Sequence, residues 1–144
     1  MVSLASVRIP RQIVDEIVAH SLEDAPDECC GLLGGVGGEA RALHRARNEF
    51  ESPLRYNVHP LDLLRITTEI EEAGQELVGI YHSHTRSEAY PSQTDVNLAE
   101  NWPDPLYLIC SVADPREPVV RAYSLRNAAI EEVQLEISEP GNDA

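Results

Sequence analysis

The chain has 144 residues, of which 42% are hydrophobic, and this length suits one globular domain with a substantial core. It carries 11 basic and 25 acidic residues, which give a formal net charge of -14. Such a charge repels phosphate backbones and anionic lipid surfaces, so it argues against nucleic acid and against a membrane as partners.

The sequence also bears on the compartment. No stretch approaches the roughly 18–20 apolar residues of a membrane helix, and the N-terminus lacks a basic and then apolar signal pattern. We therefore expect a cytoplasmic protein. Three cysteines without CxxC spacing, Cys29, Cys30 and Cys110, predict reduced thiols rather than a disulfide framework. Adjacent cysteines point in different directions, so we interpret Cys29 and Cys30 as packing residues.

The first half of the chain predicts two helices separated by a hairpin. Apolar residues at helical spacing over residues 10–20 predict an amphipathic helix, which residues 24–27 with Pro26 are expected to end. Residues 28–36 and 40–47 are expected to form strands on either side of a glycine-rich turn. Residues 50–59 follow as a loop or a short strand. Pro60 then opens a second helix that a glycine ends.

The second half of the chain is dominated by strands. Residues 77–82 form a short apolar strand, and residues 92–100 contain the start of a helix. Three further strands are expected over residues 106–112, 119–124 and 130–137. Helices interleaved with strands of both continuous apolar and alternating pattern favour the α/β class with a mixed sheet.

Two histidines and an aspartate near the strand over residues 77–82 form a candidate metal site. Residues two apart on an extended strand point to the same face, so His82 and His84 are expected to aim at one ion. A catalytic zinc takes three His or carboxylate ligands at roughly 2.0–2.2 Å and leaves one position for water or substrate. Asp95, in the first turn of the expected helix, is the candidate third ligand.

Each part of this pattern also has a plain structural interpretation. A His-x-His pair at a strand end is often only a polar surface face. Ser92-x-x-Asp95 before helix-forming residues matches a capping box, which satisfies free backbone N–H groups. The joint occurrence of these residues in one short window favours the metal site, and a capping role for Ser92 is compatible with it.

Aromatic residues flank the candidate ligands in the sequence. We expect Tyr81 and Trp102 to pack in the core. For Tyr90, which lies in the loop before the expected helix, core packing and the wall of a substrate groove both remain open.

The run His82-x-His84, seven residues, then Ser92-x-x-Asp95 resembles the signature of the JAMM or MPN-plus (Mov34/MPN/PAD-1) metallopeptidase family. That family also has a catalytic glutamate far upstream, and the segment PDECCGLLGG resembles the surroundings of that residue. The matching position here is Glu28. This assignment depends on the resemblance, since an Asp-Glu pair is otherwise an ordinary solvated loop.

The resemblance extends from about residue 13 to about residue 124 and implies the architecture of the whole chain. It implies a single JAMM/MPN-plus domain over residues 1–144 with a core over about residues 7–125. The implied fold is α/β, with a mixed curved β-sheet flanked by helices, an architecture similar to that of the cytidine deaminases. A deaminase activity is excluded because the H-x-E and P-C-x-x-C patterns are absent.

The resemblance also implies a role for each residue. His82, His84 and Asp95 would bind one Zn2+ per chain, Glu28 would act as general acid and base, and Ser92 would stabilise the developing oxyanion. Physical chemistry supports this division, because zinc lowers the pKa of bound water to about 7 and a nearby carboxylate can take the proton and pass it on.

Within the family, the sequence resembles the bacterial type that releases cysteine from the C-terminal glycine of a small ubiquitin-like sulfur-carrier protein, in cysteine biosynthesis. The implied partner is a carrier with a C-terminal Gly-Gly tail. A broader isopeptidase that removes ubiquitin-like modifiers from lysine is the competing hypothesis, and a non-catalytic MPN scaffold is a third. The oligomeric state, including a homodimer, remains open.

Overall fold

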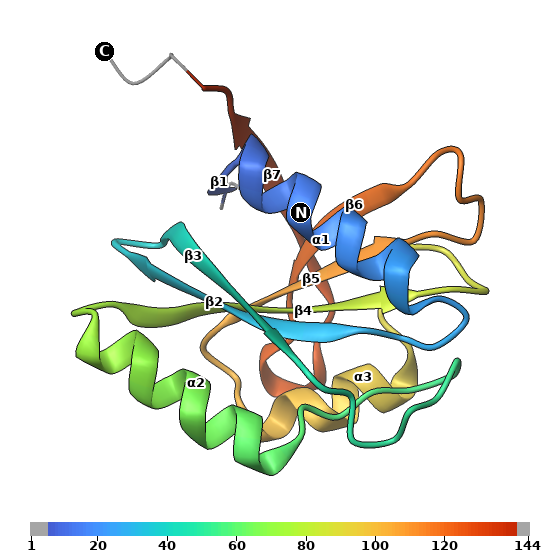
Figure 1. Ribbon diagram of the computed structural model, residues 1–144, viewed down its shortest axis with the longest axis horizontal. Coiled ribbons are helices and arrows are strands. Elements are labelled where there is room, and N and C mark those ends of the chain that lie inside the picture. Colours follow the sequence, from blue (N-terminus) through green and yellow to red (C-terminus); the bar gives the residue numbers. More distant parts are fainter. Residues whose placement is uncertain (1–5, 141–144) are drawn as a thin grey trace.

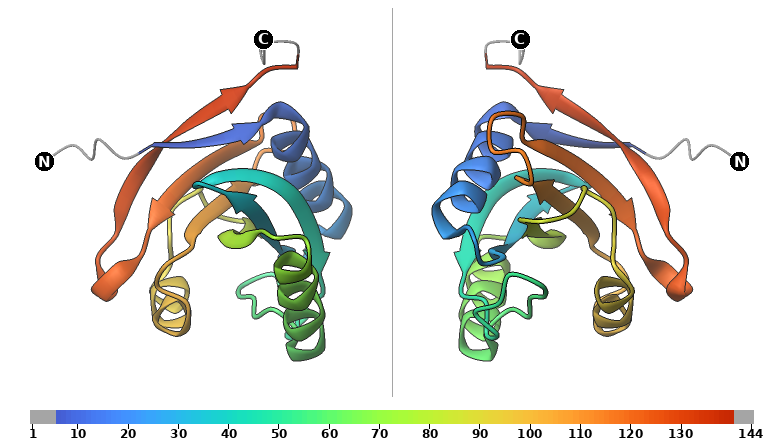
Figure 2. Two further views of the ribbon diagram at one scale, coloured as in Figure 1. Left: turned by 90° about the vertical axis from the view of Figure 1, so that its left-hand side faces the viewer. Right: turned by 90° about the vertical axis from the view of Figure 1, so that its right-hand side faces the viewer.

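Seven strands form a mixed sheet in the computed structural model, which describes residues 6–140. The strands lie in the order β1-β7-β6-β5-β4-β2-β3 (Figure 1). Their bounds are β1 (Ser6–Pro10), β2 (Cys30–Val36), β3 (Glu39–Ala46), β4 (Glu76–His84), β5 (Leu106–Ser111), β6 (Val119–Ser124) and β7 (Glu131–Ser138). The edge strands β1 and β3 approach each other, so the sheet curves until it is nearly closed (Figure 2).

The helices cover both faces of this sheet. Helix α1 (Arg11–Asp24) lies on one face, and α2 (Pro60–Glu72) and α3 (Gln93–Leu98) lie on the other (Figures 1 and 2). Two short 3-10 helices, η1 (Ala99–Asn101) and η2 (Arg126–Ala128), complete the described elements. In residues 6–140, no helix is long and apolar enough to cross a bilayer.

The sheet is mixed because β4 and β5 pair in parallel, as do β1 and β7, whereas the other neighbouring pairs are antiparallel. The central strands are buried on both faces. Ile80 of β4 packs on the α2 side, whereas Tyr81 packs on the α1 side. Two apolar clusters therefore lie back to back, as the nearly continuous apolar run of residues 77–82 predicted.

Local sequence signals account for the element boundaries. The first helix runs to Asp24 and stops before Pro26, which lacks an N–H group, as the sequence predicted. The β2–β3 turn needs Gly37 and Gly38 because their φ angles are 61° and 78°. Strand β4 extends two residues further than predicted, to His84.

Candidate metal centre

Strand β4 ends with both candidate histidines. His82 and His84 have exposures of 0% and 4%, and their Nε2 atoms lie 3.2 Å apart. The shared face follows from the strand, because alternate side chains point the same way. The predicted convergence of the two imidazoles is therefore confirmed.

Asp95 lies in the first turn of α3, where the sequence analysis placed it. Its Oδ2 atom is 3.2 Å from His82 Nε2 and 3.0 Å from His84 Nε2. Ligand atoms about 2.0–2.1 Å from a tetrahedral ion stand about 3.3–3.4 Å apart, so this triangle has the size of a zinc site. The donor set fits the expected metal, and the role of the three residues as ligands stays a prediction.

The tautomer of His84 also suits a metal. His84 Nδ1 donates a hydrogen bond to the Glu88 carbonyl at 2.8 Å, which leaves the lone pair of Nε2 directed at the triangle. Burial lowers the pKa of the His82 imidazole, which favours its neutral form. Burial alone would also lower the pKa of His84, but its contacts with Asp95 and the Glu88 carbonyl raise it. Although burial alone would raise the pKa of Asp95, the two imidazoles lower it well below its usual value. A divalent cation requires an ionised carboxylate and unprotonated Nε2 atoms, so binding would displace any proton from the triangle.

Glu28 lies two residues before the start of β2 and reaches the same place from a distant part of the sequence. One of its carboxylate oxygens and one nitrogen of each histidine lie within 4.8 Å of one another. Among residues 6–140, Glu28 Oε1 is buried with no hydrogen-bond partner, whereas Asp95 pairs with both imidazoles. Both carboxylates therefore lie near the two imidazoles, and Asp95, whose Oδ2 atom is 3.0–3.2 Å from them, stays the expected third ligand.

The electrostatic environment of Glu28 suits proton transfer. Burial raises the pKa of the Glu28 carboxyl to about 8, with the Asp95 carboxylate adding to the rise and His84 opposing it. A carboxyl group that titrates near neutral pH can both accept and release a proton during a reaction. This property separates Glu28 from Asp95, whose carboxylate stays ionised.

Strand pairing brings Glu28 to the histidines. Cys29 N donates to Ser83 Oγ at 2.8 Å, and Ser83 N donates to the Cys29 carbonyl at 3.1 Å. Cys30 is paired with His82 across β2 and β4. This register holds the start of β2 against the end of β4. The sequence alone did not establish it, because the pairing depends on contacts between residues more than fifty positions apart.

Ser92 is the N-cap residue of α3. Its Oγ accepts a hydrogen bond from Asp95 N at 3.1 Å, and Ser92 N donates to Asp95 Oδ2 at 2.9 Å. The expected capping box is therefore present, and one aspartate oxygen serves both the helix start and the triangle. The exposed Ser92 hydroxyl keeps its own hydrogen to donate, and its role toward an oxyanion stays a prediction.

Tyr56 is a site residue that the sequence analysis missed. It is 3% exposed, and its ring stacks on His82 with centroids 4.1 Å apart and an interplanar angle of 17°. It lies in the segment predicted as a loop or a short strand, which the structure describes as a loop between β3 and α2. A single aromatic residue in an irregular segment carries no periodic signal that marks it as buried.

The other aromatic residues divide between core and surface. Tyr81 is fully buried as predicted, and its hydroxyl lies 2.7 Å from His20 Nδ1. The prediction for Trp102 was wrong, because this side chain is 39% exposed. It follows the short helix η1 and lines an apolar cavity that also contains Tyr56. Tyr90 is 50% exposed and packs edge-on against Tyr123.

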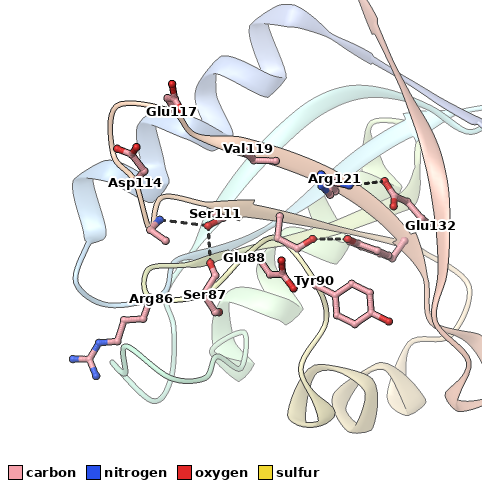
Figure 3. A pocket seen from close by; sticks show the side chains of 13 residues that line it. Arg86, Ser87, Glu88, Tyr90, Ser111, Asp114, Glu117, Val119, Arg121 and Glu132 are labelled. Carbon is pink, nitrogen blue, oxygen red and sulfur yellow. Dashed lines mark hydrogen bonds and ion pairs between the residues drawn. The ribbon is translucent and has the colours of Figure 1, made fainter.

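Two open cavities are lined by residues next to the site, one by Glu88 and the other by Glu28. One, of about 490 Å³, lies beside the loop that carries Glu88, and Tyr90 forms part of its wall (Figure 3). Ser111 Oγ donates to the Ser87 carbonyl at 2.6 Å at this cavity, which fixes the loop (Figure 3). The other cavity, of about 530 Å³, opens at Glu28. Its remaining lining residues are Asp24, Asp27, Arg47, Asn48, Glu49, Glu51 and His59.

Comparison with known proteins agrees with this geometry. Residues 10–126 match the family model described as prokaryotic homologs of the JAB domain. The CysO-cysteine peptidase of Mycobacterium tuberculosis is 38% identical over 133 residues, which cover 91% of this chain and 90% of that protein. The desampylase of Haloferax volcanii is 41% identical over 105 residues, which cover 67% of this chain and 74% of that protein.

A solved structure described as "JAMM: A Metalloprotease-like Zinc Site in the Proteasome and Signalosome" has the same fold. It has a TM-score of 0.62 and 21% sequence identity, and the match covers 94% of this chain and all of that one. The expected α/β architecture is confirmed. The chain therefore belongs to the family of prokaryotic homologues of the JAB domain, has the JAMM metalloprotease fold and is a peptidase.

Proposed function

We propose that this protein is a zinc-dependent peptidase that hydrolyses the amide between the C-terminal glycine of a small ubiquitin-like sulfur-carrier protein and cysteine. The observation that carries the proposal is the buried triangle of His82, His84 and Asp95 next to Glu28, whose buried Oε1 atom has no hydrogen-bond partner within residues 6–140. The likeness to the mycobacterial peptidase over most of both chains supports the substrate class. In this proposal the protein performs a step of cysteine biosynthesis.

One Zn2+ per chain would be held by the two Nε2 atoms and the Asp95 carboxylate. Bound there, zinc would supply Lewis-acid polarisation of the scissile carbonyl and of the attacking water. The stack of Tyr56 on His82 and the Glu88 carbonyl at His84 Nδ1 orient the two rings. Such supporting contacts tune metal affinity in known sites.

Glu28 performs the proton transfers in this mechanism. Its carboxylate takes a proton from the attacking water and passes it to the leaving nitrogen, which then departs as an amine. Burial raises the pKa of the Glu28 carboxyl to about 8 without a metal, and a cation bound at the triangle would lower it, which favours the ionised form that accepts the proton. Ser92 donates its hydroxyl hydrogen to the carbonyl oxygen as negative charge develops there, while its Oγ still accepts from the Asp95 amide.

The proposed partner is a carrier protein with a C-terminal Gly-Gly tail. The triangle is buried, so the scissile bond must reach it on an extended, narrow segment. Glycine suits such a segment because it has no side chain to obstruct close approach. Pairing of the tail with exposed backbone groups would add affinity without a requirement for side chains.

A broader isopeptidase that removes ubiquitin-like modifiers from lysine is the second candidate. The likeness to the Haloferax desampylase supports it. A physical observation also favours it, because the cavity at Glu28 is lined by further acidic residues, Asp24, Asp27, Glu49 and Glu51. An acidic cavity attracts basic residues. In a lysine-linked conjugate, the modified protein that carries the lysine could provide such residues next to the scissile bond.

Parallel assays of two conjugates test the choice. A carrier–cysteine conjugate and a lysine-linked conjugate of the same carrier are given to protein that has been stripped with chelator and reloaded with zinc. We expect zinc-dependent release of cysteine from the carrier–cysteine conjugate, with a higher kcat/KM than for cleavage of the lysine-linked conjugate. Preference for the lysine-linked conjugate would favour the isopeptidase, and hydrolysis of neither by the zinc-loaded protein would favour a non-catalytic scaffold.

A further inference from the structure

Asn48, two residues beyond the end of β3, joins two segments that form the site. We propose that Asn48 is a positioning residue for the peptidase reaction, because one side-chain amide holds both Glu28 and the loop that carries Tyr56. This inference rests on the function proposed above. It assigns a role to a residue that lines the cavity at Glu28 and acts through the backbone groups it holds rather than on the expected ligands.

The amide of Asn48 makes four hydrogen bonds to backbone groups. Its Nδ2 donates to the carbonyls of Glu28 at 3.1 Å and Arg55 at 3.0 Å. Its Oδ1 accepts from the amides of Phe50 and Asn57, both at 3.1 Å. A carboxamide has two donor hydrogens and two acceptor lone pairs, so its capacity is fully used.

Three of these bonds close the loop over residues 48–57 on itself. A backbone bridge between Asn48 and Val58 and a bond from Glu49 N to the Asn57 carbonyl at 2.8 Å complete the closure. Apart from this bridge, the loop has no regular pairing, so its shape depends on few bonds. The fourth bond leaves the loop and ends at Glu28.

The 48–57 loop holds Glu28 by both of its backbone polar groups. Glu28 N donates to the Ser52 carbonyl at 2.8 Å, and the Glu28 carbonyl accepts from Asn48. Within residues 6–140, the buried Oε1 atom of Glu28 has no hydrogen-bond partner. The direction of the carboxylate therefore depends on packing and on where the backbone of Glu28 is held.

The same amide sets the position of Tyr56. Arg55 and Asn57, the residues on either side of Tyr56, are both bonded to Asn48. The Tyr56 ring that they carry stacks on His82. Asn48 thus holds the backbone of Glu28, the expected general base. It also holds the residues on either side of Tyr56, whose ring supports the His82 imidazole.

Substitution of Asn48 by Asp separates positioning from folding. The Asn48→Asp side chain keeps its size and both acceptor bonds that close the loop, but it loses the two donor bonds, including the one to Glu28. Asn48→Ala removes all four bonds and serves as the more severe variant. The matched control is Ser52→Ala, which removes the bond from Leu54 N to Ser52 Oγ in the same loop and leaves the Ser52 carbonyl in place.

The readouts are kcat and KM on whichever conjugate the wild type cleaves, zinc per chain and Tm. We expect Asn48→Asp to lower kcat about 10-fold to 100-fold with KM within about twofold, because misplacement of a catalytic group acts on the chemical step. Zinc content and the wild-type Tm should be nearly retained. Ser52→Ala should match the wild type in kcat.

The inference is overturned if Asn48→Asp retains the wild-type kcat, or if its activity falls only in proportion to lost zinc or lost folded protein. It is also overturned if Ser52→Ala loses as much kcat as Asn48→Asp, since any change in the loop would then suffice. Wild-type protein that binds zinc but cleaves neither conjugate contradicts the proposed function instead.

Discussion

The two halves of the site are built in different ways. His82, His84 and Asp95 stand on regular elements, the end of β4 and the first turn of α3, so strand pleat and helix cap determine where they point. Glu28 precedes a strand, and Tyr56 lies in the 48–57 loop, so individual hydrogen bonds determine their positions. The expected ligands thus share the stability of the core, whereas the expected base depends on a loop. We expect substitutions in the first half to abolish metal binding and substitutions in the second half to reduce turnover alone.

The largest effect is expected from the ligand residues. His82→Ala and Asp95→Ala should each lose zinc and essentially all turnover, because two remaining ligands bind the ion far more weakly. Asp95→Ala should also lower stability by about 1 kcal/mol, since it removes half of the capping box. Metal content by mass spectrometry and Tm check this difference. Full zinc occupancy in either variant would show that other residues hold the ion.

Glu28→Gln is expected to separate binding from catalysis. The amide keeps the shape of the side chain but cannot take a proton, so turnover should fall by about 10²-fold to 10⁴-fold. Zinc content should remain at one per chain, because Glu28 stands beside the triangle. Loss of zinc equal to that of His82→Ala would instead make Glu28 a ligand.

Substitution of Ser92 should have a smaller effect on turnover. Ser92→Ala removes the cap and the hydroxyl donor, with an expected cost of about 1 kcal/mol in stability and about 10²-fold in kcat. Ser92→Asp supplies a capping acceptor without a hydroxyl donor, so it should restore stability and leave kcat low. Recovery of both quantities in Ser92→Asp would mean that Ser92 acts only as a cap.

The smallest effect is expected at Asp62, in the first turn of α2, which pairs with Arg47 just before the 48–57 loop. Hydrogen bonds from Arg47 lower the pKa of Asp62 to about 2. Because this folded-state pKa lies below the unfolded value of about 4, ionised Asp62 contributes stability above pH 4, and the contribution is lost as pH falls through about 2. Asp62→Asn should therefore cost about 1 kcal/mol at pH 7, and the difference should shrink below pH 4.

Thermal unfolding of wild type and Asp62→Asn over a pH series measures this difference. Arg65→Gln is a suitable control, since Arg65 approaches Asp62 only at 3.7 Å, against 3.0 Å for Arg47. A stability difference that stays constant from pH 7 to pH 2.5 would contradict the assignment.

The sequence was informative wherever residue spacing determines geometry. The two-residue spacing of His82 and His84 on a strand and the three-residue spacing of Ser92 and Asp95 at a helix start have only a few structural solutions, and the structure adopts the expected ones. Apolar periodicity likewise predicted the helices and most strands. Strand ends differed by about one or two residues, because sequence periodicity does not fix where pairing stops.

The rest depends on contacts between distant segments. Only the family resemblance of the segment around Glu28 indicated a place beside His82, since no local spacing relates the two residues and β2–β4 pairing brings them together. Asn48 and Tyr56 sit in an irregular loop whose shape arises from side-chain to backbone bonds, for which no sequence period exists. Trp102 was misplaced because aromatic character predicts burial only on average.

The Oδ2 atom of Asp95 accepts from the Ser92 amide and faces both imidazoles, so one oxygen serves two cooperative units. By thermodynamic linkage, loading with a cation should slow amide hydrogen exchange in α3, and a firmer helix start should in turn tighten cation affinity. The local order of α3 would then differ between the metal-free and the metal-bound enzyme.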